Sequence, residues 1–169
     1  MNRIFLTGYM GSGKSTIGKM LAANLGFSFV DLDTYIEAKY HKTIAQIFSE
    51  QGEEKFRLIE QLCLHQVAEF ENTVIATGGG APCFFDNIAF LNLHGITVYL
   101  QLTPQQLATR LESSINGIRP LLSNRKGEEL CQFISEGLAK REPFYLQSKH
   151  VIAASGTIEN ICSEIATFV

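Results

Sequence analysis

Hydrophobic and polar residues follow two different patterns along the chain. Short apolar runs, bounded by glycine or polar residues, alternate with longer stretches in which apolar residues recur every three or four positions. Short apolar runs are typical of strands buried in a parallel sheet, and the longer period is typical of amphipathic helices. The apolar runs predict five strands, at or around residues 4–7, 29–30, 73–76, 96–102 and 150–154. The helical spacing predicts helices at 14–25, 34–40, 43–51, 53–70 and 85–93, one beginning at Pro104, and two more at 128–147 and 158–168.

The order of these elements predicts the fold class. Strands separated by helices indicate a parallel sheet with helices on both faces, which is an α/β fold of three layers. We find no internal repeat, low-complexity tract or linker, so residues 1–169 are expected to form one domain. Two irregularities are expected. The polar segment 113–126 predicts a mobile loop, and Pro143 should break the helix in which it lies.

Composition narrows the functional class. The chain has 169 residues, of which 46% are hydrophobic and 18% charged, as in an ordinary globular domain with enough apolar surface to fold. Its formal net charge of −3 and its lack of a Lys/Arg run argue against nucleic acid as the main partner. No apolar run approaches the ~18 residues that a membrane span needs, so no membrane partner is expected.

Cysteine and histidine positions indicate no metal or redox site. The four cysteines form no Cys-x-x-Cys pair, so neither a zinc site nor a redox dithiol is indicated. The apolar stretch at the N-terminus is too short for a signal peptide, and we expect reduced, mostly buried thiols in a cytoplasmic protein. The histidines form no ligand pattern, and His65 is expected to be structural.

The segment from Gly8 to Ser15 fits the pattern G-x-x-x-x-G-K-[ST] at every fixed position, between a predicted strand and a predicted helix. Glycines let the backbone N–H groups turn inward around an anion, and the helix that begins there adds its positive dipole end. Lys14 can reach the β- and γ-phosphates, and the Ser15 hydroxyl suits Mg²⁺. The alternative is a glycine-rich turn with a chance lysine. The motif predicts a nucleoside triphosphate site made by Gly11, Ser12, Gly13, Lys14, Ser15 and Thr16.

Two carboxylates follow the second predicted strand. Asp31 and Asp33 are two positions apart, so in an extended strand both side chains would point to one side. The carboxyl edge of a parallel sheet is where such proteins bind ligands. One carboxylate can hold the water shell of Mg²⁺, and the other can accept a hydroxyl proton from a second substrate. The alternatives are a solvated Asp-x-Asp turn or a helix cap by Asp33.

Arg57 and the glycine triplet at 78–80 are candidates for a second binding site. Arg57 lies four residues after Glu53 and three before Glu60, so it either forms a surface ion pair or offers its guanidinium to an anionic substrate. Three successive glycines after a buried strand are costly to order on folding. Close approach of the backbone to a ligand would explain them, although a wide turn is the alternative.

Two further arginines stand next to prolines. Arg119 precedes Pro120 in the predicted mobile loop, where it is either exposed to solvent or able to close on the phosphates and neutralise developing charge. Arg141 lies two residues before Pro143, which is expected to fix its direction, and the alternative is a solvated helix surface.

In combination, these motifs resemble the shikimate kinase family. The phosphate loop alone is shared by many kinases, whereas the full set is specific and runs in the family's order over most of the chain. The motifs are Gly8-x-x-Gly11-x-Gly13-Lys14-Ser15-Thr16, Asp31-Leu32-Asp33, Phe56-Arg57, Gly78-Gly79-Gly80, Arg119-Pro120-Leu121-Leu122 and Arg141-x-Pro143-x-Tyr145.

The resemblance implies a P-loop kinase fold, a partner pair and a reaction. The implied sheet has five parallel strands in the order 2-3-1-4-5, with a substrate-binding region at about 33–61 and a lid at about 113–126. The implied reaction transfers the γ-phosphoryl group of ATP to the 3-hydroxyl of shikimate, with Mg²⁺ as cofactor. A monomeric chain is expected.

The resemblance also implies roles for individual residues. It makes Lys14, Asp33 and Arg119 catalytic, and Ser15 a metal ligand with Asp31 acting through water. Shikimate would be bound by Asp33, Arg57, Gly79 and Arg141. ATP would be bound by Gly11 to Thr16, Arg110 and Arg119, with Arg110 stacking on adenine. The segment 154–157 departs from some relatives because it carries no long cationic side chain near the adenine.

The residues alone leave two other functions open. One is a different small-molecule kinase, acting on gluconate or a nucleoside monophosphate, because all such enzymes need the same phosphate loop. The other is a nucleotide-binding regulator without catalysis. The carboxylate and arginine of the second site weigh against the regulator, since a sensor needs no second polar pocket.

Overall fold

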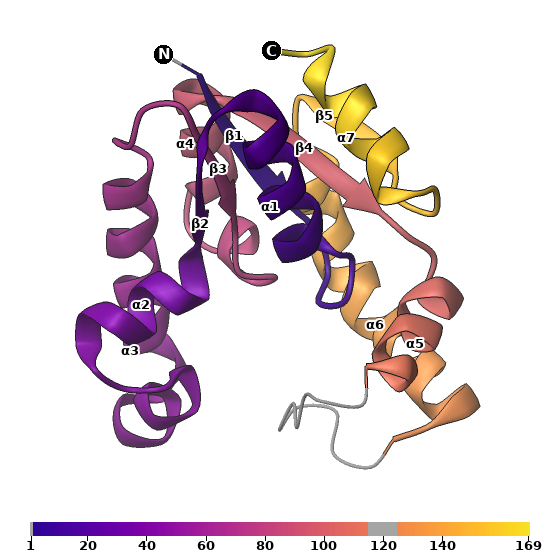
Figure 1. Cartoon of the computed structure of the whole chain (residues 1–169). Coiled ribbons are helices and arrows are strands. Elements are labelled where there is room, and N and C mark those ends of the chain that lie inside the picture. The colour runs from indigo at the N-terminus through magenta and orange to yellow at the C-terminus, as the bar shows by residue number, and fades with distance from the viewer. Residues whose placement is uncertain (1, 115–124) are drawn as a thin grey trace.

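The computed structural model describes residues 2–114 and 125–169, and its centre is one sheet of five parallel strands (Figure 1). The strand order is β2-β3-β1-β4-β5, which confirms the order expected from the family resemblance. Every pair of neighbouring strands is parallel. The strands are β1 (Arg3–Thr7), β2 (Ser28–Asp31), β3 (Thr73–Ala76), β4 (Ile96–Gln101) and β5 (His150–Ala153).

Helices connect successive strands. Each lies close to its predicted range, and the short turn η1, which follows the glycine triplet, is the element that the sequence did not predict. The helices are α1 (Lys14–Leu25), α2 (Leu32–Tyr40), α3 (Ile44–Val67), η1 (Ala81–Cys83), α4 (Asn87–His94), α5 (Pro104–Ser113), α6 (Gly127–Tyr145) and α7 (Ile158–Ala166).

The central strand β1 shows how the three layers form. Ile4 and Leu6 pack with residues of α1 and α7, whereas Phe5 points to the other face and packs with residues of α3 and α4. All three side chains are fully buried, as expected for a strand covered on both faces. Alternation of side chains along one strand therefore supplies both halves of the core.

Helix α3 combines two of the predicted helices. Gly52, with φ of 79° and ψ of 170°, interrupts it at the predicted boundary between 43–51 and 53–70. Thr43 accepts a hydrogen bond from the Gln46 backbone and Gln46 bonds back to the Thr43 backbone, so a capping box fixes the start of the helix. The helix ends at Val67 rather than at residue 70, because the chain turns there toward β3.

The prediction that Pro143 breaks its helix is wrong. Helix α6 runs through Pro143 to Tyr145, and the Leu146 N–H still bonds to the Glu142 carbonyl at 2.9 Å. Proline removes one donor in the last turn, where little helix remains to be disrupted. Arg141 and Tyr145 consequently stay one helical turn apart on the same face.

Two helical arms extend past the carboxyl ends of the strands. In Figure 1, α2 and α3 lie on one side and α5 and α6 on the other, with the turn between β1 and α1 between them. The N- and C-termini lie at the opposite end of the sheet (Figure 1). Residues that follow the strands are thereby collected at one edge.

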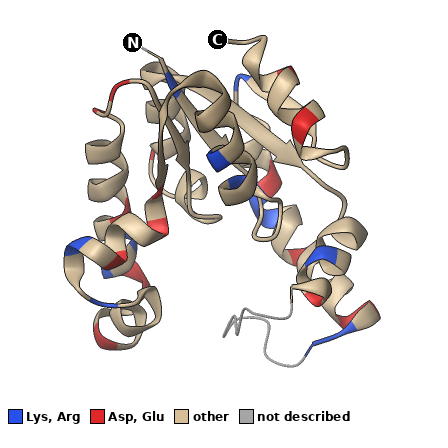
Figure 2. Cartoon of the chain, in the orientation of Figure 1, with Lys and Arg blue, Asp and Glu red and all other residues tan. Residues whose placement is uncertain are grey.

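Charged residues of both signs lie along the helices, where Figure 2 shows Lys and Arg interspersed with Asp and Glu. Within 2–114 and 125–169, no helix has the length and apolar character needed to cross a bilayer. All four cysteines are free thiols; Cys63 and Cys162 are buried, and Cys83 and Cys131 are partly buried.

Gly95, between α4 and β4, is expected to tolerate no side chain. A Cβ there would lie 2.5 Å from the Arg3 carbonyl oxygen and 2.8 Å from the Phe5 ring. Gly95→Ala should therefore lower the free energy of unfolding by about 1–3 kcal/mol in urea denaturation. The matched control is Gly156→Ala, because nothing lies within 4 Å of a Cβ there. Equal losses in the two variants would contradict this explanation.

Candidate active site

The turn between β1 and α1 has the geometry of an anion-binding loop. Gly11 and Gly13 have φ of 83° and 92°, a region that side chains disfavour, so glycine is required at both positions. Gly13 caps α1, and the first N–H groups of a helix have no partner within the helix, so they are available to an anion. Lys14 Nζ donates to the carbonyl oxygens of Gly8 and Tyr9 at 2.7 and 3.0 Å. The loop thus carries its cation beside the open N-terminus of the helix.

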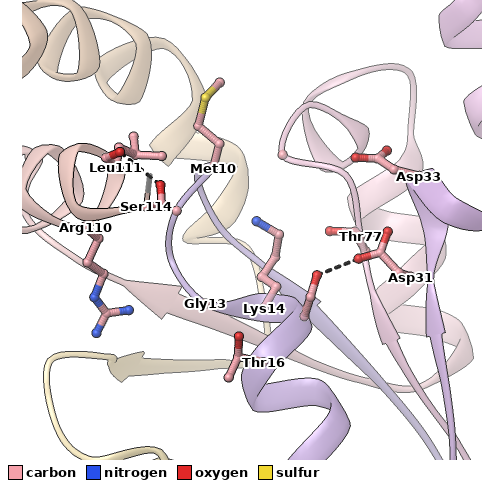
Figure 3. Close-up of a pocket in the computed structure, with 13 residues that line it drawn as sticks. Met10, Gly13, Lys14, Thr16, Asp31, Asp33, Thr77, Arg110, Leu111 and Ser114 are labelled. Atoms are coloured by element: carbon pink, nitrogen blue, oxygen red, sulfur yellow. Dashed lines mark hydrogen bonds between the residues drawn. The ribbon is translucent and has the colours of Figure 1, made fainter. Parts of the chain in front are cut away.

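Asp31 connects the end of β2 to this loop. Its Oδ2 accepts a hydrogen bond of 2.5 Å from Ser15 Oγ (Figure 3). Its Oδ1 accepts one of 3.2 Å from the Thr34 backbone N–H. Asp31 is therefore the N-cap of α2. The alternative that Asp33 caps a helix is wrong, because the helix begins at Leu32, two residues earlier than the sequence suggested.

Asp33 reaches the site from a helix. The prediction that it shares an extended strand end with Asp31 is wrong, since the Asp31 cap starts α2 at once. Both carboxylates still line one cavity, because a helix start turns the chain back over the strand end. Asp33 is accessible to solvent within this cavity, yet its pKa is raised, first by desolvation and then by the neighbouring Asp31 charge.

Two cavities of about 310 Å³ each meet at this edge of the sheet. Met10, Asp33 and Gly79 line both, so the cavities share a wall. Figure 3 shows Arg110 and Leu111 on one side of the Gly13–Lys14 turn and Asp31, Asp33 and Thr77 on the other. The first cavity is also lined by Gly11, Gly13, Lys14, Ser15, Thr16, Asp31, Thr77, Arg110, Leu111 and Ser114.

The second cavity is lined by both apolar and charged side chains. Besides the residues that it shares with the first cavity, it is lined by three apolar side chains, two arginines, a glutamate and two glycines. This mixture suits a small anion with an apolar ring face. The lining residues other than the shared ones are Ile44, Phe48, Phe56, Arg57, Glu60, Gly78, Gly80 and Arg141.

Arg57 is buried in this wall, with 8% of its surface exposed. Its guanidinium donates to Glu60 Oε2 at 2.7 Å and to Glu53 Oε1 at 3.3 Å. The guanidinium carbon lies 4.0 Å from the centre of the Phe84 ring. The alternative of a surface ion pair is therefore wrong. Arg57 Nε is buried and has no hydrogen-bond partner among the described residues.

Glu60 is the main residue that sequence reasoning missed. It is 2% exposed, and burial raises its pKa although the Arg57 charge opposes the shift. Its spacing of three from Arg57 was the available signal, but that spacing fits a surface pair equally well. Burial was decided by packing, not by spacing.

Close approach of side chains explains two of the three glycines. A Cβ at Gly80 would lie 2.5 Å from Arg57 Nη1, and one at Gly78 would lie 2.9 Å from Glu60 Oε1. A Cβ at Gly79 would make only an ordinary contact with Arg141 Nη1, at 3.7 Å. Gly78 and Gly80 thus leave room for the pair of Arg57 and Glu60.

The remaining predicted arginines fall in three places. Arg141 lines the second cavity, with its guanidinium carbon 5.5 Å from the centre of the Tyr9 ring. Arg110 donates to the Ser12 carbonyl at 3.2 Å and to the Ala154 carbonyl at 2.6 Å. It also lines a third cavity of about 250 Å³ with residues of α5 and Ser155. Arg119 lies outside the described residues, as do positions 115–124 of the predicted lid.

The comparisons with known proteins agree with this geometry. A family model described as shikimate kinase matches residues 10–169. The chain belongs to the shikimate kinase family. A shikimate kinase of Parabacteroides distasonis is 58% identical over 148 residues, which cover 88% of this chain and 85% of that protein.

Solved structures of the shikimate kinase family superpose closely on the chain. The crystal structure of shikimate kinase from Bacteroides thetaiotaomicron has a TM-score of 0.94 and 46% identity, and the match covers 99% of this chain and 97% of that one. The Acinetobacter baumannii shikimate kinase, in complex with shikimate, has a TM-score of 0.87 and 35% identity, covering 99% and 92%. The family resemblance and the strand order are thereby confirmed.

Asp33 should weaken the fold at neutral pH. A carboxyl whose pKa is raised on folding is protonated more readily in the folded state, so its ionised form opposes folding. Asp33→Asn should therefore be at least as stable as the wild type in urea denaturation at pH 7. The difference should shrink as the pH falls from the raised pKa of the folded state toward the ordinary Asp value of 3.8, and it should vanish below 3.8, where both states are protonated. A variant clearly less stable at pH 7 would contradict the sign of this effect.

Proposed function

We propose that the protein transfers the γ-phosphoryl group of ATP to the 3-hydroxyl of shikimate, giving shikimate 3-phosphate and ADP. The observation that carries the proposal is the shared wall: the cavity with two arginines joins the phosphate-loop cavity at Asp33. Membership of the shikimate kinase family supports the same reaction. Phosphoryl transfer needs this adjacency, because acceptor and donor must meet in line.

In this proposal the second cavity binds shikimate. Its carboxylate would be held by Arg57 and Arg141, since guanidinium groups bind carboxylates by paired hydrogen bonds. Both arginines line this cavity, so both can face a bound carboxylate. Asp33 would accept hydrogen bonds from the hydroxyls, and Gly79 would supply a backbone donor. The apolar wall suits one face of the ring.

The first cavity would bind the phosphates of ATP. Backbone N–H groups from Gly11 to Thr16 and the Lys14 ammonium would surround them. The guanidinium of Arg110 donates to two backbone carbonyl oxygens, which restrict its position, and it would stack on adenine. Arg119 remains a prediction as the lid arginine that neutralises charge on the transferred group.

The residues beside the phosphate loop fit a magnesium ion. The Ser15 hydroxyl and the Asp31 carboxylate offer hard oxygen atoms as metal ligands, and Ser15 Oγ lies 2.5 Å from Asp31 Oδ2. Among the residues that the structure describes, no three His, Cys, Asp or Glu side chains gather as a metal site. Mg²⁺ suits such a sparse set because it keeps several waters and phosphate oxygens as ligands. When bound with ATP, it supplies charge neutralisation at the phosphates.

Asp33 would have two parts in the transfer. It lies on the wall common to both cavities, where it can orient the acceptor hydroxyl toward the γ-phosphate. Its raised pKa also makes it a stronger base than an ordinary Asp. The loose transition state of phosphoryl transfer makes proton removal late, so orientation is the larger contribution.

An acceptor assay tests the proposal against its nearest rivals. The protein is mixed with ATP, Mg²⁺ and shikimate, gluconate or a nucleoside monophosphate in turn, and ADP release is measured. We expect turnover with shikimate alone. Turnover with gluconate or a monophosphate but not with shikimate would favour another small-molecule kinase. ATP binding without turnover on any acceptor would favour a regulator.

Loss of the Arg57 guanidinium should mainly weaken shikimate binding. By analogy with other broken charge pairs, Arg57→Ala should cost about 2–5 kcal/mol of binding free energy in calorimetric titration. Lys55→Ala is the matched control, because Lys55 is an exposed cation two residues away on the same helix. Equal shikimate affinity in wild type and Arg57→Ala would refute the role.

A second variant separates binding from stability. Arg57→Ala leaves Glu60 buried without its ion-pair partner, which should also weaken the fold. Adding Glu60→Gln removes that unpaired charge. The double variant should regain part of the lost stability and none of the shikimate affinity.

A further inference from the structure

A buried tyrosine lies behind the wall that the two cavities share. Tyr145 is fully buried at the end of α6, and its hydroxyl donates to the Gly79 carbonyl oxygen at 2.5 Å. Gly79 lines both cavities. The hydroxyl therefore contacts the shared wall from the protein side, where no substrate can reach it.

This hydrogen bond fixes the direction of a backbone donor. The described peptide bonds are all trans. In a planar trans peptide the N–H of the next residue points away from the carbonyl oxygen. Holding the Gly79 carbonyl consequently sets the direction of the Gly80 N–H, at a residue that lines the second cavity. Glycine leaves this peptide more conformational freedom than another residue would, so a hydrogen bond to its carbonyl adds a restraint.

Helix α6 carries both Arg141 and Tyr145. Arg141, one turn before Tyr145, lies in the second cavity, and its Nη1 would be 3.7 Å from a Cβ at Gly79. The continuation of α6 through Pro143 keeps the two side chains on one face. One rigid element thus brings an arginine and a hydroxyl to the same glycine, and the two side chains also interact with each other.

The Tyr145 ring is held independently of its hydroxyl. It packs against the Tyr99 ring, with 5.1 Å between ring centres. Tyr99 in turn donates to Glu142 Oε1 at 3.0 Å. Burial raises the pKa of the Tyr145 hydroxyl above its ordinary value, so it stays protonated and remains a donor. Removal of the hydroxyl alone should leave the ring in place.

We propose that Tyr145 is a positioning residue for the acceptor, acting through the Gly79–Gly80 peptide and not by contact with a substrate. The inference rests on the proposed function, in which the second cavity holds shikimate. Without the hydroxyl, the peptide can rotate and the backbone donors of the triplet lose their fixed directions. The acceptor site should weaken while the phosphate loop is unaffected.

The test compares Tyr145→Phe with Tyr99→Phe. Both keep the ring and lose one buried hydroxyl, but only the first loses a bond to the glycine triplet. We expect the KM for shikimate to rise about three- to tenfold in Tyr145→Phe, the effect of losing one orienting hydrogen bond. The KM for ATP should stay within about twofold, and Tyr99→Phe should leave both KM values near those of the wild type.

An NMR measurement reports on the peptide itself. The amide resonance of Gly80 should shift in Tyr145→Phe without substrate and stay in place in Tyr99→Phe. An unchanged shikimate KM, equal effects in the two variants, or loss of the fold in Tyr145→Phe alone would each overturn the proposal. Failure of the wild type to phosphorylate shikimate would instead count against the proposed function, and the Gly80 resonance would still test the positioning.

Discussion

The burial of one guanidinium determines much of the second cavity. Arg57 lies between aromatic rings and a buried carboxylate, and removal of such a charge from water is costly unless its partners are close. Glu60 supplies the compensating charge at 2.7 Å. The room for this pair comes from Gly78 and Gly80, where a side chain would collide with it. The ion pair therefore requires glycine at both positions.

The site gains its chemistry from two cavities that share a wall. Asp33 belongs to both, and desolvation there raises the pKa of its carboxyl. The raised pKa means that the ionised carboxylate is expected to oppose folding. The same placement lets one side chain face the second cavity and the phosphate loop together.

Helix α6 links the second cavity to the core. Its Arg141 faces the second cavity, and its Tyr145 is buried against Tyr99 and the glycine triplet. A helix that is packed along one side holds its exposed side chains within narrow limits. Pro143, which the sequence marked as a break, lies in the last turn and leaves this register intact. The arginine is therefore positioned by a rigid element and not by a loop.

The sequence alone determined the phosphate loop, the alternation of strands and helices, and the candidate residues Asp33, Arg57 and Arg141, because these depend on local spacing and on motifs. The tertiary structure decided what spacing leaves open. It buried the Arg57–Glu60 pair and brought the Tyr145 hydroxyl to a glycine 66 positions away. Burial and long-range contacts depend on which elements pack together. The spacing of apolar residues along a helix shows which face is buried, but it does not show which element covers that face.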